Sequence, residues 1–114
     1  MDKLNSYREL IQRLLTSYQS LSEKSSKSTD IESVLVFDEK RDHYLWMRSG
    51  WEKNHRIRGI TIYIRIKNDK IWVEEDWTNL DVVGDLLEAG VPNEDIVLGF
   101  QPPDVRKYTD FAIA

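Results

Sequence analysis

The segment from Arg58 to Ile66 constrains the fold more than any other part of this chain. Its apolar side chains recur at every second residue, which is the period of a β-strand. A shift of one residue would move this whole apolar set into water, so the register of the strand is strongly specified. The chain must therefore build a sheet that buries one face of this strand. The alternating apolar positions are Ile60, Ile62, Ile64 and Ile66, with Thr61, Tyr63 and Arg65 between them.

Three further apolar segments, joined by short polar turns, predict the rest of this sheet. Short turns connect neighbouring strands in opposite directions, so the sequence favours an antiparallel meander of four strands. The strands are expected at residues 31–37, 43–51, 58–66 and 71–77, with charged or polar turns at 38–42, 52–55 and 67–70.

The N-terminal part of the chain has a different period. Apolar residues recur at intervals of three and four, which predicts one apolar stripe on a helix from about residue 3 to 22. Such a stripe needs a partner surface, and the predicted sheet supplies one. The segment from Lys24 to Asp30 contains no apolar residue and is expected to be a loop. The stripe consists of Leu4, Tyr7, Ile11, Leu14, Leu15, Tyr18 and Leu21.

The C-terminal third contains short elements. Asn79 is expected to cap a helix from Leu80 to Ala89, and Gly90 suits the position after its end. A further short helix could begin at Pro92, although Ile96 to Leu98 could equally form a strand. The last residues are apolar, including Tyr108, Phe111 and Ile113, so the tail is expected to dock on the body.

These patterns together predict one α+β domain over residues 1–114. In this domain an N-terminal helix packs on a four-stranded antiparallel meander, followed by one or two short C-terminal helices.

Charge and composition limit the classes of function. The chain has no cysteine, which excludes disulfides and thiolate chemistry, and no apolar run approaches the length of a membrane span. The N-terminus lacks an apolar signal core, so a cytoplasmic location is expected. The net charge of −4 argues against nonspecific binding of nucleic acid, yet residues 1–70 hold 14 basic and 10 acidic side chains, whereas residues 71–114 hold 2 and 10. The two halves could pair with each other, or a basic strip from Lys53 to Lys70 could contact DNA.

Few residues suggest catalysis or metal binding. Glu74 and Asp76 are expected on one strand face, where they could hold Mg²⁺ or simply face solvent. Asp38-Glu39-Lys40 resembles part of a nuclease motif, but a charged turn also produces such a tripeptide. The two histidines, His43 and His55, fall at strand edges or turns. We therefore expect no catalytic residues and no cofactor, and we rank a metal-dependent nuclease last.

Aromatic and basic side chains supply the candidate contact residues. Tyr44, Trp46, Tyr63 and Trp72 are expected on one face of the sheet, opposite the face of Leu45 and Met47. Such a face could bind a protein partner, stack on single-stranded nucleic acid, form a homo-oligomer, or lie beneath a helix as part of the core. The candidate set is Tyr44, Trp46, Arg56, Arg58, Tyr63, Arg65, Lys67 and Trp72.

Several spaced blocks of sequence resemble the XisI-like family. The resemblance covers nearly the whole chain from about Tyr7, although Tyr63-Ile64-Arg65-Ile66 departs from the family's pattern of a histidine and an aspartate there. The blocks are Asp42-His43-Tyr44-Leu45 with Gly50-Trp51, Lys70-Ile71-Trp72-Val73-Glu74 with Asp76 and Thr78, Gly90-Val91-Pro92, Asp95-Ile96-Val97-Leu98 with Phe100, and Pro103, Arg106, Tyr108-Thr109 and Phe111-Ala112.

The resemblance implies a function that the residues alone do not. Members of this family look like accessory factors of programmed DNA excision that act with a companion protein, XisH, and a site-specific recombinase. The family carries over no catalytic residues. We therefore expect a non-catalytic controlling factor for excision of an fdxN-type element that binds a protein partner such as XisH, with direct DNA binding by residues 53–70 as the alternative.

Overall fold

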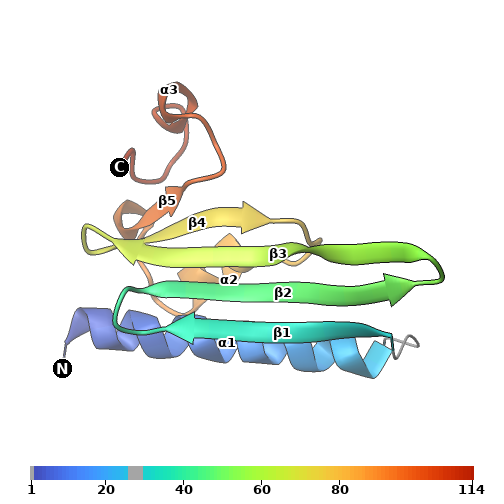
Figure 1. Cartoon of the computed structure of the whole chain (residues 1–114). Helices are drawn as coiled ribbons and strands as arrows, with labels where there is room; N and C mark the ends of the chain where they lie inside the picture. The colour runs from blue at the N-terminus through green and yellow to red at the C-terminus, as the bar shows by residue number, and fades with distance from the viewer. Residues whose placement is uncertain (1, 26–29) are drawn as a thin grey trace.

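The computed structural model describes residues 2–25 and 30–114 and contains one five-stranded sheet with helices at its sides (Figure 1). In chain order the strands are β1 to β5, and neighbours in sequence are neighbours in the sheet. The elements are α1 (Lys3–Ser25), β1 (Ile31–Asp38), β2 (His43–Glu52), β3 (His55–Lys67), β4 (Lys70–Asp76), α2 (Val82–Glu88), the 3₁₀ turn η1 (Asn93–Asp95), β5 (Ile96–Leu98) and α3 (Pro103–Arg106).

The first four strands form the predicted antiparallel meander, but the sheet has a fifth strand. β5 pairs in parallel with β4, Ile71 opposite Ile96, after the crossover through α2. The prediction of four antiparallel strands was therefore incomplete. Three apolar residues carry no periodicity that separates a strand from a helix, and only the vacant edge of β4 made Ile96–Leu98 a strand.

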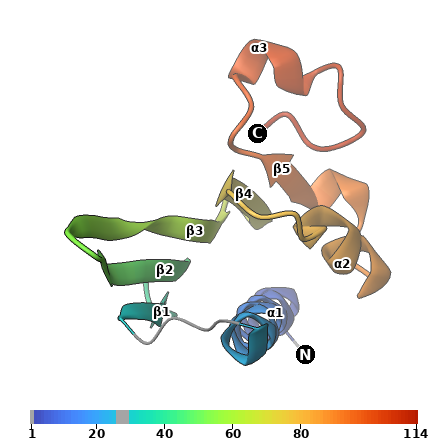
Figure 2. The same ribbon diagram turned by 90° about the vertical axis from the view of Figure 1, so that its right-hand side faces the viewer.

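The predicted N-terminal helix is confirmed, and it extends to Ser25. Residues 26–29 of the predicted loop lie outside the described residues. α1 packs on β1 and β2 on the same side of the sheet as α2 (Figure 2). Most of its stripe is buried or half-buried, whereas Leu21 is exposed, and Leu10 joins the core although it was not part of the predicted stripe. In the described part of the chain, no helix has the length and apolarity needed to cross a bilayer.

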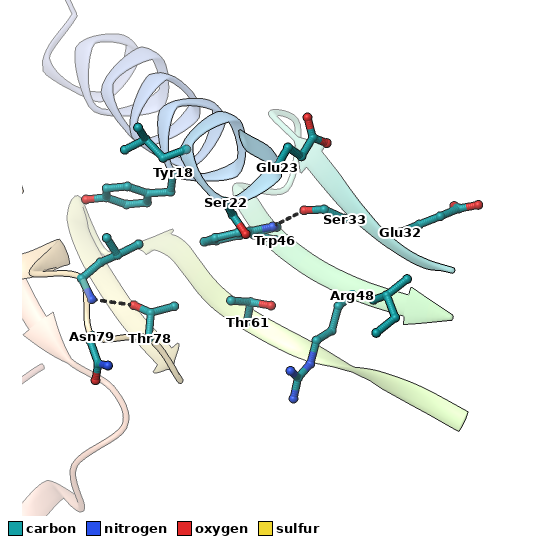
Figure 3. A pocket seen from close by; sticks show the side chains of 13 residues that line it. Tyr18, Ser22, Glu23, Glu32, Ser33, Trp46, Arg48, Thr61, Thr78 and Asn79 are labelled. Atoms are coloured by element: carbon teal, nitrogen blue, oxygen red, sulfur yellow. Dashed lines mark hydrogen bonds between the residues drawn. The ribbon is translucent and has the colours of Figure 1, made fainter. Parts of the chain in front are cut away.

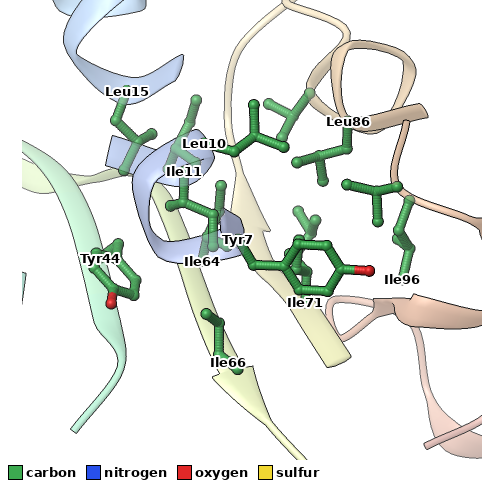
Figure 4. Packing of buried hydrophobic residues seen from close by; sticks show 14 of the residues in the cluster. Tyr7, Leu10, Ile11, Leu15, Tyr44, Ile64, Ile66, Ile71, Leu86 and Ile96 are labelled. Atoms are coloured by element: carbon green, nitrogen blue, oxygen red, sulfur yellow. The ribbon is translucent and has the colours of Figure 1, made fainter. Parts of the chain in front are cut away.

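Three buried tyrosines tie the elements together through aspartate carboxylates. Tyr7 on α1 donates to Asp95 in η1, and Tyr18 on the same helix donates to Asp85 in α2. Tyr44 on β2 donates to Asp42 over 2.9 Å. Each bond satisfies a phenol hydroxyl while the ring belongs to the hydrophobic core, as Figure 4 shows for Tyr7 and Tyr44. Burial and the neighbouring carboxylate raise the pKa of all three phenols.

Several local predictions hold and others are corrected. Asn68 and Asp69 both have positive φ, as a two-residue type I′ hairpin requires. Gly90, with φ 101°, ends α2, and Val91 N–H donates to Leu86 C=O as in a Schellman motif. The predicted cap Asn79 was wrong: Asp81 accepts from Gly84 N–H over 3.0 Å, and α2 begins at Val82. Pro92 precedes a single 3₁₀ turn instead of an α-helix.

The C-terminal segment is only partly docked. Ala112 N–H donates to Ile96 C=O over 2.9 Å, and Phe111 packs against the core. Tyr108 and Ile113 are exposed, however, so the expected docking of the whole tail was wrong. Residues 99–114, which we call the C-terminal wall, rise from β5 on the side of the sheet opposite α1 (Figure 2).

Candidate interaction site on the open face of the sheet

The side of the sheet that turns away from α1 and α2 carries most of the predicted contact residues. Residues paired across an antiparallel ladder point to the same face, so the register assigns each side chain to one side. We call this side the open face. It comprises Glu32, Val34, Val36 and Asp38 of β1, His43, Leu45, Met47, Ser49 and Trp51 of β2, Arg56, Arg58, Ile60, Tyr63, Arg65 and Lys67 of β3, and Lys70, Trp72 and Glu75 of β4, with Glu74 beside Arg65.

Two of the predicted contact residues lie on the opposite face. Tyr44 pairs with Ile64 and Trp46 pairs with Ile62, so both rings point toward α1 and are buried. Trp46 Nε1 donates to Ser33 Oγ there. The expectation that these rings share a face with Tyr63 and Trp72 was therefore wrong, and they belong to the core. Leu45 and Met47 point outward instead.

A β-bulge corrects the prediction for the long strand. Trp46 pairs with Ile62, whereas Met47 pairs with Ile60, so Thr61 is an extra residue. The bulge reverses the alternation, and Ile60 joins the open face while Ile62, Ile64 and Ile66 stay in the core. The four isoleucines consequently do not all point one way.

The far end of the β2–β3 hairpin is strongly basic. We call residues 48–59 the basic arm, because they include four exposed cations, Arg48, Lys53, Arg56 and Arg58. β4 pairs with β3 only as far as Ile62, so the arm extends past that neighbour (Figure 1). Among the described residues none of these four cations forms an ion pair. The arm also contains one acidic residue, Glu52, so its four cations and one carboxylate leave a net charge of +3.

Arg56 and Trp51 form the centre of the arm's open side. Arg56 Cζ lies 5.5 Å from the centroid of the Trp51 ring, in a cation–π contact. Its guanidinium also donates to Ser49 Oγ over 3.1 Å and to Gly50 C=O over 3.3 Å. Half of the Trp51 side chain remains exposed. These contacts hold a planar cation and an indole together at the surface.

The opposite end of the open face is occupied by contacts within the chain. Arg65 Nη1 lies 3.5 Å from Glu74 Oε2, and Tyr63 Oη bonds to His43 Nδ1 over 2.7 Å. Burial is the main cause that raises the pKa of Tyr63. Lys67 Nζ lies 5.0 Å from the ring of Trp72. Arg65, Tyr63 and Trp72 therefore serve mainly to hold this end of the sheet together.

Glu74 and Asp76 do not share a face of β4. Glu74 is an extra residue in β4, where Ile64 pairs with Val73 but Tyr63 pairs with Glu75. This second bulge leaves Glu74 beside Arg65 and turns Asp76 to the face of Ile62, where it accepts from Thr78. The expected shared face of Glu74 and Asp76 was therefore wrong. Among the described residues no three acidic or histidine side chains come close enough to hold a metal.

Asp38 has a local structural role. Its carboxylate accepts from the backbone N–H groups of Lys40 and Arg41 over 3.1 and 3.0 Å, and these bonds lower the pKa of Asp38, Arg41 N–H most of all. The resemblance of Asp38-Glu39-Lys40 to a nuclease motif thus reflects the β1–β2 turn.

A hollow on the helix side was not anticipated from the sequence. It has a volume of about 1060 Å³ and lies between the end of α1, the β2–β3 hairpin and residues 78–80 (Figure 3). Tyr18 and Trp46 line it, but their polar atoms are bonded to Asp85 and Ser33. Its lining comes from α1, β1, β2, β3 and residues 78–80, which are distant in sequence, so no local pattern signals it.

Comparison with known proteins agrees with the fold. No curated protein is significantly similar to the chain. A crystal structure of a XisI-like protein from Anabaena variabilis ATCC 29413 superposes with a TM-score of 0.91 at 41% identity, covering 97% of this chain and 99% of that one. The crystal structure of the fdxN element excision controlling factor XisI from the same strain superposes with a TM-score of 0.88 at 46% identity, covering 99% of this chain and 100% of that one. The family model for XisI protein matches residues 1–113, and this chain belongs to the XisI family.

Proposed function

We propose that this chain is a non-catalytic controlling factor for excision of a DNA element, and that it acts in the cytoplasm by binding a protein partner through the basic arm. The relation to a structure of an fdxN element excision controlling factor supports the role in excision. The partner of this proposal is an XisH-like protein within a site-specific recombinase complex.

The net positive charge of the basic arm is the observation that carries the binding step. Arg56 and Arg58 are exposed on one face and Arg48 on the other, next to the exposed ring of Trp51. Arginine and tryptophan dominate the energetics of protein interfaces, because both combine a large planar contact area with hydrogen bonding. A cationic arm of this kind requires an acidic partner surface.

Co-expression with an XisH-like protein tests this proposal. The two proteins should elute together from a sizing column, and the double variant R56A/R58A should weaken the complex at least about tenfold, as expected for central arginines. The single variants R56A and R58A should each weaken it as well, and R13A is their matched control, since it removes one arginine charge at an exposed position on α1. Separate elution of the wild-type proteins at micromolar concentration would refute the proposal.

The same arm favours one second candidate, direct contact with DNA. A two-stranded ribbon can enter a groove of the duplex, and an exposed indole can stack on an unpaired base. The basic strip from Lys53 to Lys70 supplies cations for phosphates, although Arg65 and Lys67 already have partners within the chain.

Salt dependence separates the two candidates. Contact with duplex DNA predicts that log K falls with log salt with a slope of about −0.9 for each phosphate neutralised. R58A should lower the magnitude of this slope by about one such unit, and R13A should leave it unchanged. Absence of a mobility shift at low salt would remove DNA contact and leave the protein partner.

A further inference from the structure

We propose that two copies of this chain form a symmetric dimer in which the C-terminal wall of each copy lies on the open face of the other. This inference goes beyond the proposed function and does not depend on it. It concerns the part of the open face away from the basic arm.

The open face of β1 to β3 carries two apolar rows that no helix covers within residues 2–25 and 30–114. One row runs across the strands as Val36, Leu45 and Tyr63, and the next as Val34, Met47 and Ile60. Each row consists of cross-strand neighbours, so the six side chains form one continuous patch. Val36 is 43% exposed, and the other five are half-buried. A continuous patch of this kind is typical of an interaction surface.

The C-terminal wall is also apolar, and it is held firmly in place. Phe100, Tyr108 and Ile113 are 48%, 80% and 58% exposed, and Val105 is exposed as well. Arg106 donates to four carbonyls, those of Leu98, Gly99, Gln101 and Ile113, at 3.1–3.5 Å. The wall is thus an ordered structure that presents large apolar side chains to solvent.

The surface area of the chain matches this picture. Its accessible area is 7524 Å², whereas a compact monomer of 13.5 kDa exposes about 6,500 Å². The excess of roughly 1,000 Å² is comparable to the ~800 Å² that each partner buries in an interface of standard size. The radius of gyration, 15.0 Å, likewise exceeds the ~13 Å of a compact chain of this length.

Shape and charge indicate that the occupant is a second copy. The wall rises from one edge of the sheet while the apolar rows lie toward the other edge (Figure 2), so a two-fold axis along the strands brings each wall over the opposite rows. Both surfaces carry both signs of charge: Asp38 and Lys67 on the open face, and Asp104, Lys107 and Asp110 on the wall. Mixed charges can pair between identical copies. The basic arm extends along the strands past the end of the β3–β4 ladder and therefore lies outside the contact.

The molar mass in solution tests the dimer. Sedimentation or light scattering of the full chain at micromolar concentration should give twice 13.5 kDa. V36E and Y108E should each weaken self-association at least about tenfold while the circular dichroism spectrum stays unchanged, because both side chains are exposed. L80S is the matched control, since Leu80 is exposed beside the hollow on the helix side. A monomeric wild type would overturn the proposal, as would V36E and Y108E proteins that remain fully dimeric.

Disulfide trapping tests the arrangement, because the natural chain has no cysteine. V36C and Y108C single variants are mixed in equal amounts and oxidised gently. Wall-on-face packing predicts that the mixed 36–108 disulfide forms several times faster than either homodisulfide. A predominance of homodisulfides would refute this packing even if the chain is dimeric. Neither result bears on the basic arm, so failure of the dimer and failure of the proposed function remain distinguishable.

Discussion

The guanidinium of Arg106 lies over the indole of Trp72, with 5.2 Å between Cζ and the ring centroid. The same guanidinium donates from Nε to Gln101 C=O over 3.1 Å, and Trp72 Nε1 donates to Lys67 C=O over 3.0 Å. One arginine therefore joins α3, the loop before it and the open face of β4. The C-terminal wall is also joined to the sheet by the N–H groups of Gly99, Phe100 and Gln101, by Phe111 and by the bridge at Ala112.

Replacing Arg106 with alanine should loosen the wall. The R106A variant loses a cation–π contact and charge-assisted hydrogen bonds, and we expect the free energy of unfolding to fall by about 2 kcal/mol. R106K should recover only part of the lost free energy of unfolding, because the ammonium group of lysine lacks the planar guanidinium with its several N–H donors. Chemical denaturation and limited proteolysis within residues 99–114 measure both effects. K107A, at an exposed neighbouring position, is the control, and unchanged proteolysis of R106A would contradict the assignment.

Acid should weaken the contact between α1 and the β1–β2 turn. Arg8 Nε donates to Asp42 Oδ1 over 2.7 Å, and this bond, with that of Tyr44, lowers the pKa of Asp42. Because the pKa of Asp42 is lower in the folded chain than in the unfolded chain, its ionised carboxylate stabilises the fold at pH values above the unfolded pKa of about 3.9. This stabilisation is lost as the pH falls through the pKa of the folded state. D42N should therefore cost roughly 1–2 kcal/mol near neutral pH, and its difference from the wild type should shrink below about pH 4.

Asparagine suits this position in other respects, since Asp42 has φ 62° and asparagine tolerates the left-handed region. D69N is the matched control, because Asp69 has φ 65° in the other hairpin turn and no side-chain bond of Asp69 is found among the described residues. Urea titrations from pH 3 to 8 measure the effect. A D42N deficit that stays constant over this range would show that the ion pair is not its cause.

Gly50 should not tolerate a side chain. A Cβ at this position would lie 2.1 Å from Asp30 O and 2.6 Å from Ile31 Cα, and both are backbone atoms at the start of β1. G50A must therefore shift one strand against the other, which we expect to cost about 1–3 kcal/mol, as overpacking does. The neighbouring S49A is the control, and thermal unfolding measures both. A G50A variant as stable as the wild type would mean that the start of β1 can move away from Gly50 at little cost in free energy.

The last four residues should contribute to stability through one side chain. Deletion of residues 111–114 removes the packed ring of Phe111 and the Ala112–Ile96 hydrogen bond, so the free energy of unfolding should fall by roughly 1.5–3 kcal/mol. Deletion of only residues 113–114 should cost much less, because Ile113 is exposed. Denaturation at matched protein concentration compares the two. Equal losses would place the stabilisation in the final two residues instead.

The sequence located the long elements because their signals are local. The stripe of α1 includes Tyr7, Ile11 and Leu15, and all three are buried. The Asn68-Asp69 pair adopts the left-handed turn that its residue types favour, and Gly90 ends α2. For the candidate site, Arg56 and Arg58 were found from charge alone, because exposed cations need no knowledge of their neighbours.

The two faces of β2 show where local signals end. Tyr44 and Trp46 alternate with Leu45 and Met47, and both pairs are apolar enough to be buried. Only the pairing of Tyr44 with Ile64, together with the position of α1, chose the aromatic pair for the core. The bulges at Thr61 and Glu74 likewise depend on contacts between strands, and each moved one predicted neighbour to the other face.

The sequence by itself determined the α+β class, the N-terminal helix, the order of the meander strands and the basic character of the arm. Hydrophobic periodicity, turn residues and charge are properties of a few neighbouring residues, so they can be recognised in the sequence without knowledge of the fold. The tertiary structure alone decided which face of each strand is open, that β5 adds in parallel to β4, and that Arg106 secures a wall beside that open face. These choices depend on burial and on hydrogen bonds between segments far apart in the chain, and the free energy of such contacts exists only once the segments meet.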